Sequence, residues 1–300
     1  MQYNEFRKWL LAQGFSLITI NKTLRYIQYL ENKLNINFDE IENIEEIVER
    51  FIIFREKGLP LKTLNNWVKY INRYITFRGI EPKLKYYREY SDDYLKIPSD
   101  EDVKKILSVR WARPDVDLRN RSMLFVLFST GIRIGELIAL NWNDLDLKDY
   151  LLIIRRGKFE KQRVIPIPPK VVKLLLEYKK YRIASDPNAI FTTIQGRITY
   201  SYARNVIKEA GKKAGIPWFH AHAARHWRAI KWLEQGINIE TIRRLLGHTS
   251  LKTTQRYLRA LSLKFSIEEV MKKDHFFGPW PNLGPSIKRP KGGDFENDME

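Results

Sequence analysis

Residues 220–260 read HAHAARHWRAIKWLEQGINIETIRRLLGHTSLKTTQRYLRA. The stretch holds four of the five histidines of the chain, six arginines and one tyrosine, Tyr257. His222 and Arg225 lie three residues apart, so on a helix they share a face. They place a hydrogen-bond donor beside a planar guanidinium, an arrangement that suits a phosphate oxygen.

Three helices are predicted within this stretch. Apolar residues at three-residue steps predict the first over 223–233. The second is predicted over 239–246, where Gly247 ends it. The third carries the tyrosine and should begin at Thr253 or Thr254, whose hydroxyls can cap a helix.

A second motif lies upstream, in residues 122–147, which read SMLFVLFSTGIRIGELIALNWNDLDL. The apolar residues predict a buried helix that runs to Thr130 and is broken by Gly131. A new helix is predicted to begin near Ile134. Arg133 then lies beside a helix N-terminus, whose free N–H groups already favour an anion.

Strand-like alternation appears only once over a sizeable stretch. Residues 150–156 and 163–168 alternate around residues 157–162, which predicts a β-hairpin. Two basic helices are predicted after it, over 170–182 and 201–214. The chain is therefore predicted to be mainly α with a small β-hairpin or sheet, an α+β fold.

The N-terminal region reads as four amphipathic helices, the second capped by Ser16 and the fourth ending near Gly79. After it the helical periodicity is lost, and it resumes at Ser99 with Asp102 in a capping-box position. The expected organisation is a helical domain over 1–88, a linker over 89–98, a second domain over 99–275 and a C-terminal tail, expected to be flexible, over 276–300.

The charge of the chain indicates a polyanionic partner. Its net charge is +18, with a pI of about 9.8. Residues 1–98 hold 16 basic and 13 acidic side chains, whereas residues 99–275 hold 34 and 18. Most of the excess therefore accompanies the arginine- and histidine-rich motifs, and nucleic acid is the expected partner.

Other classes are excluded by composition. The chain has no cysteine, so it has neither disulfides nor thiolate chemistry. The first residues lack the apolar core of a signal peptide. No apolar run reaches the ~18 residues of a membrane span. A cytoplasmic, nucleoid-associated protein without a membrane partner is expected.

The combined motifs resemble the tyrosine recombinases, a family that includes phage integrases and Xer-type recombinases. The first part of the likeness is His-x-x-Arg-His, then Leu-Gly-His, then Thr-Thr-x-x-Tyr. The residues that carry it are His222, Arg225, His226, Leu246, Gly247, His248, Thr253, Thr254 and Tyr257. The upstream motif resembles the Thr-Gly-x-Arg-x-x-Glu-Leu box of the family through Arg133 and Glu136. The N-terminal helices resemble its core-binding domain, a DNA-binding unit.

The resemblance implies a site-specific recombinase or integrase that cuts and rejoins duplex DNA through a 3′-phosphotyrosyl link, without metal, ATP or another cofactor. The implied catalytic residues are Arg133, Lys158, His222, Arg225, His248 and the nucleophile Tyr257. Glu136 and His226 are implied as supporting residues, although Glu136 could equally serve the dipole of its helix. The hairpin turn reads Gly-Lys-Phe where the family usually has Gly-Lys-Gly, so Lys161 competes with Lys158 for the role of the turn lysine.

Further basic residues of the second domain are expected to contact DNA. They are Arg155, Arg156, Lys161, Arg163, Arg204, Lys208, Arg228, Arg243 and Arg244.

Three alternatives stand beside this interpretation. His220, His222 and His226 have a spacing that could bind a metal, although no nearby cysteine or carboxylate supports it. A DNA-binding protein without chemistry would explain the charge but not the ordered catalytic residue types. A type IB topoisomerase would share the chemistry.

Residues 266–273 suggest how the protein assembles. Ser266 and Glu269 can form a capping box, and the short helix that follows has an apolar stripe too narrow to be stable alone. Docking on its own chain is the simpler possibility. The resemblance implies docking on a neighbouring protomer, and hence a homotetramer on paired DNA sites.

Overall fold

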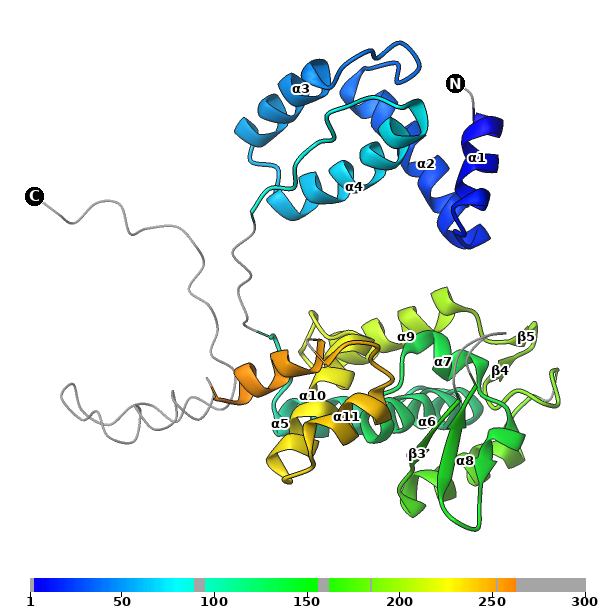
Figure 1. The fold of residues 1–300 in the computed structure, drawn as a ribbon. Coiled ribbons are helices and arrows are strands. Elements are labelled where there is room, and N and C mark those ends of the chain that lie inside the picture. Colours follow the sequence, from blue (N-terminus) through cyan, green and yellow to red (C-terminus); the bar gives the residue numbers. More distant parts are fainter. Residues whose placement is uncertain (1–2, 89–94, 156–161, 184, 252, 263–300) are drawn as a thin grey trace, which may run out of the picture. The chain divides into compact units, whose positions relative to one another are not determined.

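The computed structural model describes residues 3–88, 95–155, 162–183, 185–251 and 253–262 (Figure 1). The chain divides into two compact units, Met1–Asp92 and Asp93–Glu300, and each has its own hydrophobic core. Most of the expected linker, the hairpin turn at 156–161 and the C-terminal segment from residue 263 lie outside the described residues. Within the described ranges no helix is both long and apolar enough to cross a membrane.

The described part of the first unit is helical. Its helices are α1 (Tyr3–Ala12), α2 (Leu17–Leu34), α3 (Glu45–Glu56) and α4 (Leu61–Arg78). The Ser16 hydroxyl accepts a hydrogen bond from the N–H of Thr19 at 3.3 Å and so begins α2, as predicted. Gly79 ends α4 in the left-handed conformation, with φ of 71°.

Aromatic side chains dominate the core of the first unit. Phe6, Trp67 and Tyr74 are each at most 1% exposed, and the ring of Phe6 meets that of Tyr74 edge-on at 5.0 Å. Burying a side chain of this size contributes roughly 1.5–3 kcal/mol. This packing, more than helix propensity, therefore holds the helices together.

The second unit is also mainly helical, and the predicted fold class is confirmed. Its helices are α5 (Asp100–Ser108), α6 (Pro114–Thr130), α7 (Ile134–Ala139), α8 (Pro169–Tyr181), α9 (Tyr200–Lys213), α10 (Ala221–Glu234) and α11 (Ile239–Leu246). Residues 253–262 are helical as well. α6 contacts both α8 and α10 and is buried along much of its length, so it forms the centre of this core.

The predicted hairpin is present and is joined by a further short strand. The strands of the second unit are β1 (Leu145–Asp146), β2 (Leu151–Ile154), β3 (Arg163–Pro166), β4 (Thr192–Thr193) and β5 (Gly196–Arg197), and a 3-10 helix η1 (Trp142–Asp144) precedes β1. β1, β2 and β3 form an antiparallel sheet in that order, and β4 pairs with β5. Strands of two residues have no alternation to detect, so the short strands lie outside the predicted hairpin.

The ends of α6 and α11 lie against each other. Gly131 ends α6 with φ of 64°, and a Cβ built there would lie 3.0 Å from a methyl carbon of Leu246. Glycine is therefore required by both backbone conformation and space. This close approach brings the upstream motif of the sequence next to the downstream one.

The predicted start of the last helix is wrong. Leu251 is already helical, so Thr253 and Thr254 lie inside the helix and not at its N-cap. Thr254 is fully buried, and its hydroxyl is 2.9 Å from Nδ1 of His248. The contact with His248 therefore accounts for the buried position of Thr254 within the helix.

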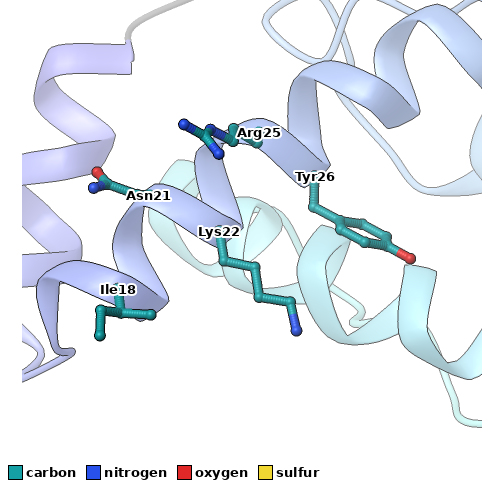
Figure 2. A pocket seen from close by; sticks show the side chains of 5 residues that line it. All are labelled: Ile18, Asn21, Lys22, Arg25 and Tyr26. Carbon is teal, nitrogen blue, oxygen red and sulfur yellow. The ribbon is translucent and has the colours of Figure 1, made fainter. Parts of the chain in front are cut away.

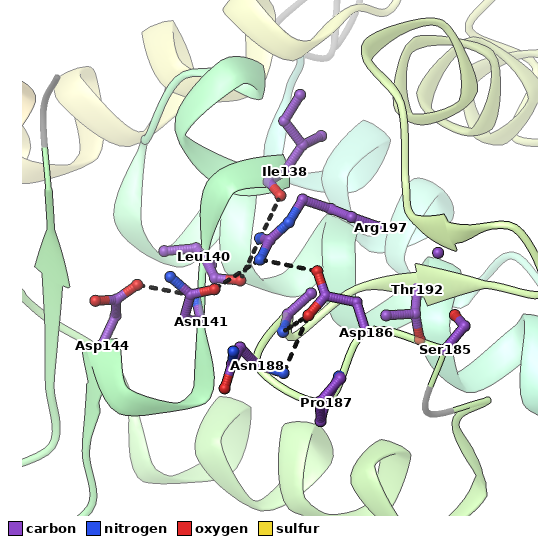
Figure 3. A network of polar contacts seen from close by, with 12 residues as sticks. Ile138, Leu140, Asn141, Asp144, Ser185, Asp186, Pro187, Asn188, Thr192 and Arg197 are labelled. Carbon is purple, nitrogen blue, oxygen red and sulfur yellow. Dashed lines mark hydrogen bonds and ion pairs between the residues drawn. The ribbon is translucent and has the colours of Figure 1, made fainter.

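Arg197 ties β5 to the end of α7 (Figure 3). Its guanidinium donates to the carbonyls of Ile138 and Leu140, at 3.1 Å each, and to the side chain of Asn141 at 2.7 Å. It also pairs with Asp186 at 3.2 Å. The chain after α7 is therefore anchored to the β4–β5 hairpin by polar contacts.

Candidate active site

Arg225 is the most deeply buried of the site residues on α10. Only 3% of Arg225 is exposed, and its buried guanidinium is hydrogen-bonded within the protein. Nη1 donates to the carbonyl of Gly131 at 2.8 Å and Nη2 to the carbonyl of Leu246 at 2.6 Å. Burial, together with the positive charge of Arg133, lowers the pKa of Arg225 to about 10. Arg225 therefore remains charged at neutral pH while it bridges the ends of α6 and α11.

Arg133 begins α7 and is held by a carboxylate. Its Nη1 donates to Oε1 of Glu136 at 3.1 Å and its Nη2 to the carbonyl of Gly247 at 3.2 Å. Arg163 donates to both Glu136 oxygens, at 2.8 and 2.7 Å. Burial alone would raise the pKa of Glu136, but the hydrogen bonds from Arg163 and from the Arg133 backbone lower it to about 2. Glu136 is thus an ionised anchor for two arginines.

Tyr257 lies within the core beside two histidines. It is 1% exposed, and its hydroxyl oxygen is 3.0 Å from Nδ1 of His226. Its ring stacks on that of His248, with centroids 6.2 Å apart. Burial raises the pKa of Tyr257, while the charges of Arg225 and Arg256 oppose that effect. The hydroxyl is therefore protonated at neutral pH and has a histidine nitrogen within hydrogen-bonding distance.

The other histidines of α10 lie nearer the surface. The Nδ1 of His220 accepts a hydrogen bond from the N–H of Ala223 at 3.2 Å and caps the helix. His222 is exposed, and its ring centroid is 6.4 Å from that of His226. Among the described residues, no three histidine or carboxylate side chains are grouped so that they could hold a metal. The geometry therefore does not support the metal-binding alternative.

Five of the six expected catalytic residues converge in one region. Arg133, Arg225 and Tyr257 influence one another electrostatically, and His222 and His248 lie beside them. They come from the start of α7, from α10, from the turn after α11 and from the helix at 253–262. The sixth residue, Lys158, lies outside the described residues, as do Arg156 and Lys161.

The remaining basic residues differ in how free they are to meet DNA. Arg204 and Lys208 are exposed on α9. The side chain of Arg155 is 52% exposed although it pairs with Asp144. Arg244, 75% exposed, pairs with Glu240 at 3.0 Å. All four side chains are accessible to solvent.

Three residues predicted to contact DNA have contacts with other side chains or carbonyls of the protein. The Arg163 side chain is 9% exposed and is bound by Glu136. Arg243 donates to Glu240 and to the carbonyl of His248. The guanidinium of Arg228 lies 4.7 Å from the ring of Trp232. Net charge along the sequence does not distinguish such arginines from solvated ones.

The comparisons with known proteins agree with this geometry. Residues 99–263 match the model of the phage integrase family. The chain is 30% identical to tyrosine recombinase XerA of Pyrococcus furiosus, over 91% of this chain and 95% of that one. It is 32% identical to XerA of Thermococcus onnurineus, over 85% and 89% respectively.

Solved structures give the same result for the fold. The crystal structure of XerH site-specific recombinase bound to a palindromic difH substrate matches with a TM-score of 0.69 and 20% identity, over 88% of this chain and 82% of that one. A lambda integrase dimer bound to a COC′ core site matches with a TM-score of 0.65 and 16% identity, over 85% and 93%.

The chain belongs to the phage integrase family. It is thus a tyrosine recombinase, an enzyme, which decides against a DNA-binding protein without chemistry and favours recombination over topoisomerase-like relaxation. In this recombinase Arg163 links the upstream and downstream motifs, and neither Arg163 nor Thr254 carried a local sequence signal for its contact. Each meets its partner only through tertiary packing.

His226 should make the recombinase sensitive to acid. Burial, with the charge of Arg256 next, lowers the pKa of His226 to about 3, whereas an unfolded histidine titrates near 6.5. Between these two pKa values the unfolded state therefore binds more protons than the folded state. The contribution of His226 to the free energy of unfolding is fully present above pH ~6.5 and falls by about 1.4 kcal/mol per pH unit below it.

We expect His226→Asn to show a shallower loss of stability than wild type between pH 7 and 5, as measured by the midpoint of urea unfolding. A slope that is unchanged in this variant would show that other groups cause the acid sensitivity.

Proposed function

We propose that this recombinase cuts and rejoins duplex DNA at specific sites through a 3′-phosphotyrosyl intermediate on Tyr257, without metal or ATP. The observation that carries the proposal is the convergence of two arginines, Arg133 and Arg225, on the neighbourhood of one tyrosine hydroxyl. Two guanidinium groups can neutralise the non-bridging oxygens of a phosphodiester, whose negative charge otherwise repels a nucleophile. The DNA bound in the crystal structures of XerH and lambda integrase supports duplex DNA as the substrate.

The residues around the phosphate would share the proton transfers. As the oxygen of Tyr257 bonds to phosphorus outside the core, its proton passes to solvent or to a neighbouring base, because the low pKa of His226, about 3, makes that histidine a poor acceptor. His222 and His248 donate hydrogen bonds to the phosphate. The bond to the 5′ oxygen breaks, and that oxygen takes a proton from a lysine. The reverse attack by a 5′ hydroxyl restores the phosphodiester and the tyrosine, so bond energy is conserved.

Tyr257 must become accessible before it reacts. At 1% exposure its hydroxyl cannot reach a phosphate of a duplex. We infer that DNA binding shifts the helix at 253–262 or the tyrosine side chain, so that the hydroxyl leaves the core and meets the phosphate held by the arginines.

A nicked suicide duplex tests the proposed chemistry. Cleavage of such a DNA releases a short fragment that diffuses away, so a covalent intermediate accumulates. We expect a protein–DNA adduct that survives denaturation and maps to the peptide that contains Tyr257, with chelator present and ATP absent. Recovery of cleaved DNA without any adduct would contradict a phosphotyrosyl mechanism.

We propose Lys158 as the acid that protonates the leaving 5′ oxygen. A 5′-bridging phosphorothiolate has a leaving group that needs no proton, so it should restore cleavage to Lys158→Ala but not to Arg133→Ala. Cleavage rates on both substrates measure the difference. If Lys161→Ala is rescued and Lys158→Ala cleaves ordinary DNA normally, the acid is Lys161.

The first unit is proposed to be the core-binding domain. α2 presents Asn21, Lys22 and Arg25 to solvent beside Ile18, around a shallow hollow that Tyr26 also lines (Figure 2). Amide and basic side chains on an exposed helix face suit base edges and phosphates of a duplex. In a Lys22→Ala, Arg25→Ala double variant, the dependence of DNA affinity on salt should become less steep. An unchanged slope would place the contacts elsewhere.

We propose that the recombinase assembles as a homotetramer on paired sites through residues 266–273, which lie outside the described residues. A chain that ends at Lys264 should cleave a single suicide site but fail to join two sites, as read from synaptic complexes and recombinant products. Normal recombination by this shortened chain would refute exchange of the segment between protomers. Since the substrate is duplex DNA, we infer a cytoplasmic, nucleoid-associated location.

A further inference from the structure

The turn that ends α11 is surrounded by arginines from three other parts of the second unit and from α11 itself. Four successive backbone carbonyls each accept a hydrogen bond from a different guanidinium. The pairs are Arg163 Nε to Leu245 O at 2.8 Å, Arg225 Nη2 to Leu246 O at 2.6 Å, Arg133 Nη2 to Gly247 O at 3.2 Å and Arg243 Nη1 to His248 O at 2.7 Å.

The chemistry of a helix end explains this gathering. The last carbonyls of an α-helix have no partner within the helix, and they carry the negative end of its dipole. Gly247 turns the chain away in the left-handed conformation, with φ of 65°, and thereby leaves these carbonyls open to outside donors. The end of α11 can therefore hold several like-charged guanidinium groups close together.

Arg163 differs from Arg133 and Arg225 because each of its three guanidinium nitrogens donates to a group within the protein. It lies on β3 with 9% of its side chain exposed, and all three of its guanidinium nitrogens are engaged. Nη1 and Nη2 bind the two oxygens of Glu136, and Nε binds Leu245. Its position therefore fixes the carboxylate relative to the end of α11.

Glu136 is shared by two cations. Its Oε1 accepts from Nη1 of Arg133 at 3.1 Å as well as from Arg163 at 2.8 Å. If Arg163 were absent, the buried carboxylate would have Arg133 as its remaining guanidinium partner among these contacts. The charge of Arg133 would then be neutralised within the protein, and the guanidinium would be drawn toward Glu136 and away from a phosphate.

We propose that Arg163 is a positioning residue. It neutralises Glu136, so that the positive charge of Arg133 remains available to a DNA phosphate. Through its bond to the end of α11 it also fixes the position of Arg133 relative to Arg225. This inference rests on the proposed role of Arg133 and Arg225 in holding the scissile phosphate. Arg163 itself does not touch the DNA.

The test measures single-turnover cleavage of the suicide duplex, DNA affinity and thermal midpoint for a set of full-length variants. Arg163→Met should cleave on the order of 100-fold more slowly than wild type, as expected for a displaced charge donor, with affinity changed by less than about threefold. Arg163→Lys keeps the charge but not the paired hydrogen bonds, so its cleavage rate should lie between those of Arg163→Met and wild type. Adding Glu136→Gln to Arg163→Met should restore about tenfold of the lost rate, because the carboxylate that would draw Arg133 away from the phosphate is removed.

Arg119→Met is the matched control. Arg119 is also a buried arginine, 6% exposed, and it donates to the carbonyl of Thr192 and to the hydroxyl of Tyr202, outside the proposed site. Its loss should lower the thermal midpoint and leave cleavage within about threefold of wild type, as for a substitution remote from the reacting groups.

The outcomes separate this inference from the proposed function. Normal cleavage by Arg163→Met, a loss of rate that Arg119→Met reproduces at the same thermal midpoint, or no recovery in the double variant would each overturn the positioning role. If Arg163→Met does not fold, Arg163→Lys and its double variant with Glu136→Gln decide instead. Normal cleavage by Arg133→Ala would refute the phosphate clamp itself, whereas an inactive Arg133→Ala beside a fully active Arg163→Met would refute only this inference.

Discussion

Tyr257→Phe is expected to abolish covalent capture of DNA completely and to leave duplex affinity within about threefold of wild type, because phosphate contacts supply most of the binding energy. The substitution removes a single oxygen and keeps the ring that stacks on His248. It leaves Nδ1 of His226 without its 3.0 Å partner, which costs about 1 kcal/mol and does not unfold the protein. The measurement is adduct formation on the suicide duplex beside a gel-shift titration.

Tyr178→Phe provides the matched control for this experiment. Tyr178 is likewise 1% exposed in the core of the second unit, and its hydroxyl accepts a hydrogen bond from the N–H of Thr192 at 3.3 Å. Its phenylalanine variant loses a comparable buried hydroxyl but should form the adduct at the wild-type rate. An adduct with Tyr257→Phe, or none with Tyr178→Phe, would remove the basis for Tyr257 as nucleophile.

Local rules made the helices of this recombinase predictable. α11 occupies the predicted residues 239–246 because Asn238 caps its start and Gly247 adopts the left-handed turn that ends it. The capping box of Ser99 and Asp102 was found for the same reason, since both partners lie within one helical turn. Such features depend on a few neighbouring residues, and the sequence contains all of them.

Contacts between distant residues could not be obtained in this way. Arg163 and Glu136 are 27 residues apart, and Arg225 and Gly131 are 94 apart. On the sequence, Arg163 resembled any other exposed strand arginine beside a turn, and only the packing of β3 against α11 reveals that it is buried. Family resemblance assigned roles to the signature residues but not to this one, because Arg163 lies outside the family motifs.

Arg133→Ala and Arg225→Ala should both reduce cleavage by a factor on the order of 100 to 1,000, the loss expected when a preorganised charge donor is removed. The effects on stability should differ. Arg133 is 37% exposed at its side chain, and its removal leaves Glu136 bound by Arg163. The thermal midpoint of Arg133→Ala should therefore stay close to that of wild type.

Arg225→Ala should also destabilise the second unit, because Arg225 joins two helix ends as well as facing the proposed phosphate site. Its loss leaves the carbonyls of Gly131 and Leu246 buried without these donors, at a cost of about 1–3 kcal/mol each. Arg225→Lys should not restore activity, because one ammonium cannot reproduce the fork that spans both carbonyls. Thermal midpoints and single-turnover cleavage measured on the same samples distinguish the two arginines.

Arg197→Ala supplies the comparison that separates stability from chemistry. Arg197 also bridges two carbonyls at a helix end, those of Ile138 and Leu140, but it takes no part in the proposed site (Figure 3). It should lower the thermal midpoint while leaving cleavage close to wild type. If Arg197→Ala lost as much cleavage as Arg225→Ala at an equal thermal midpoint, the defect of Arg225→Ala would reflect loosened packing and not a lost phosphate contact. If only the Arg225 variant is inactive, the guanidinium that joins α6 to α11 also acts on the DNA.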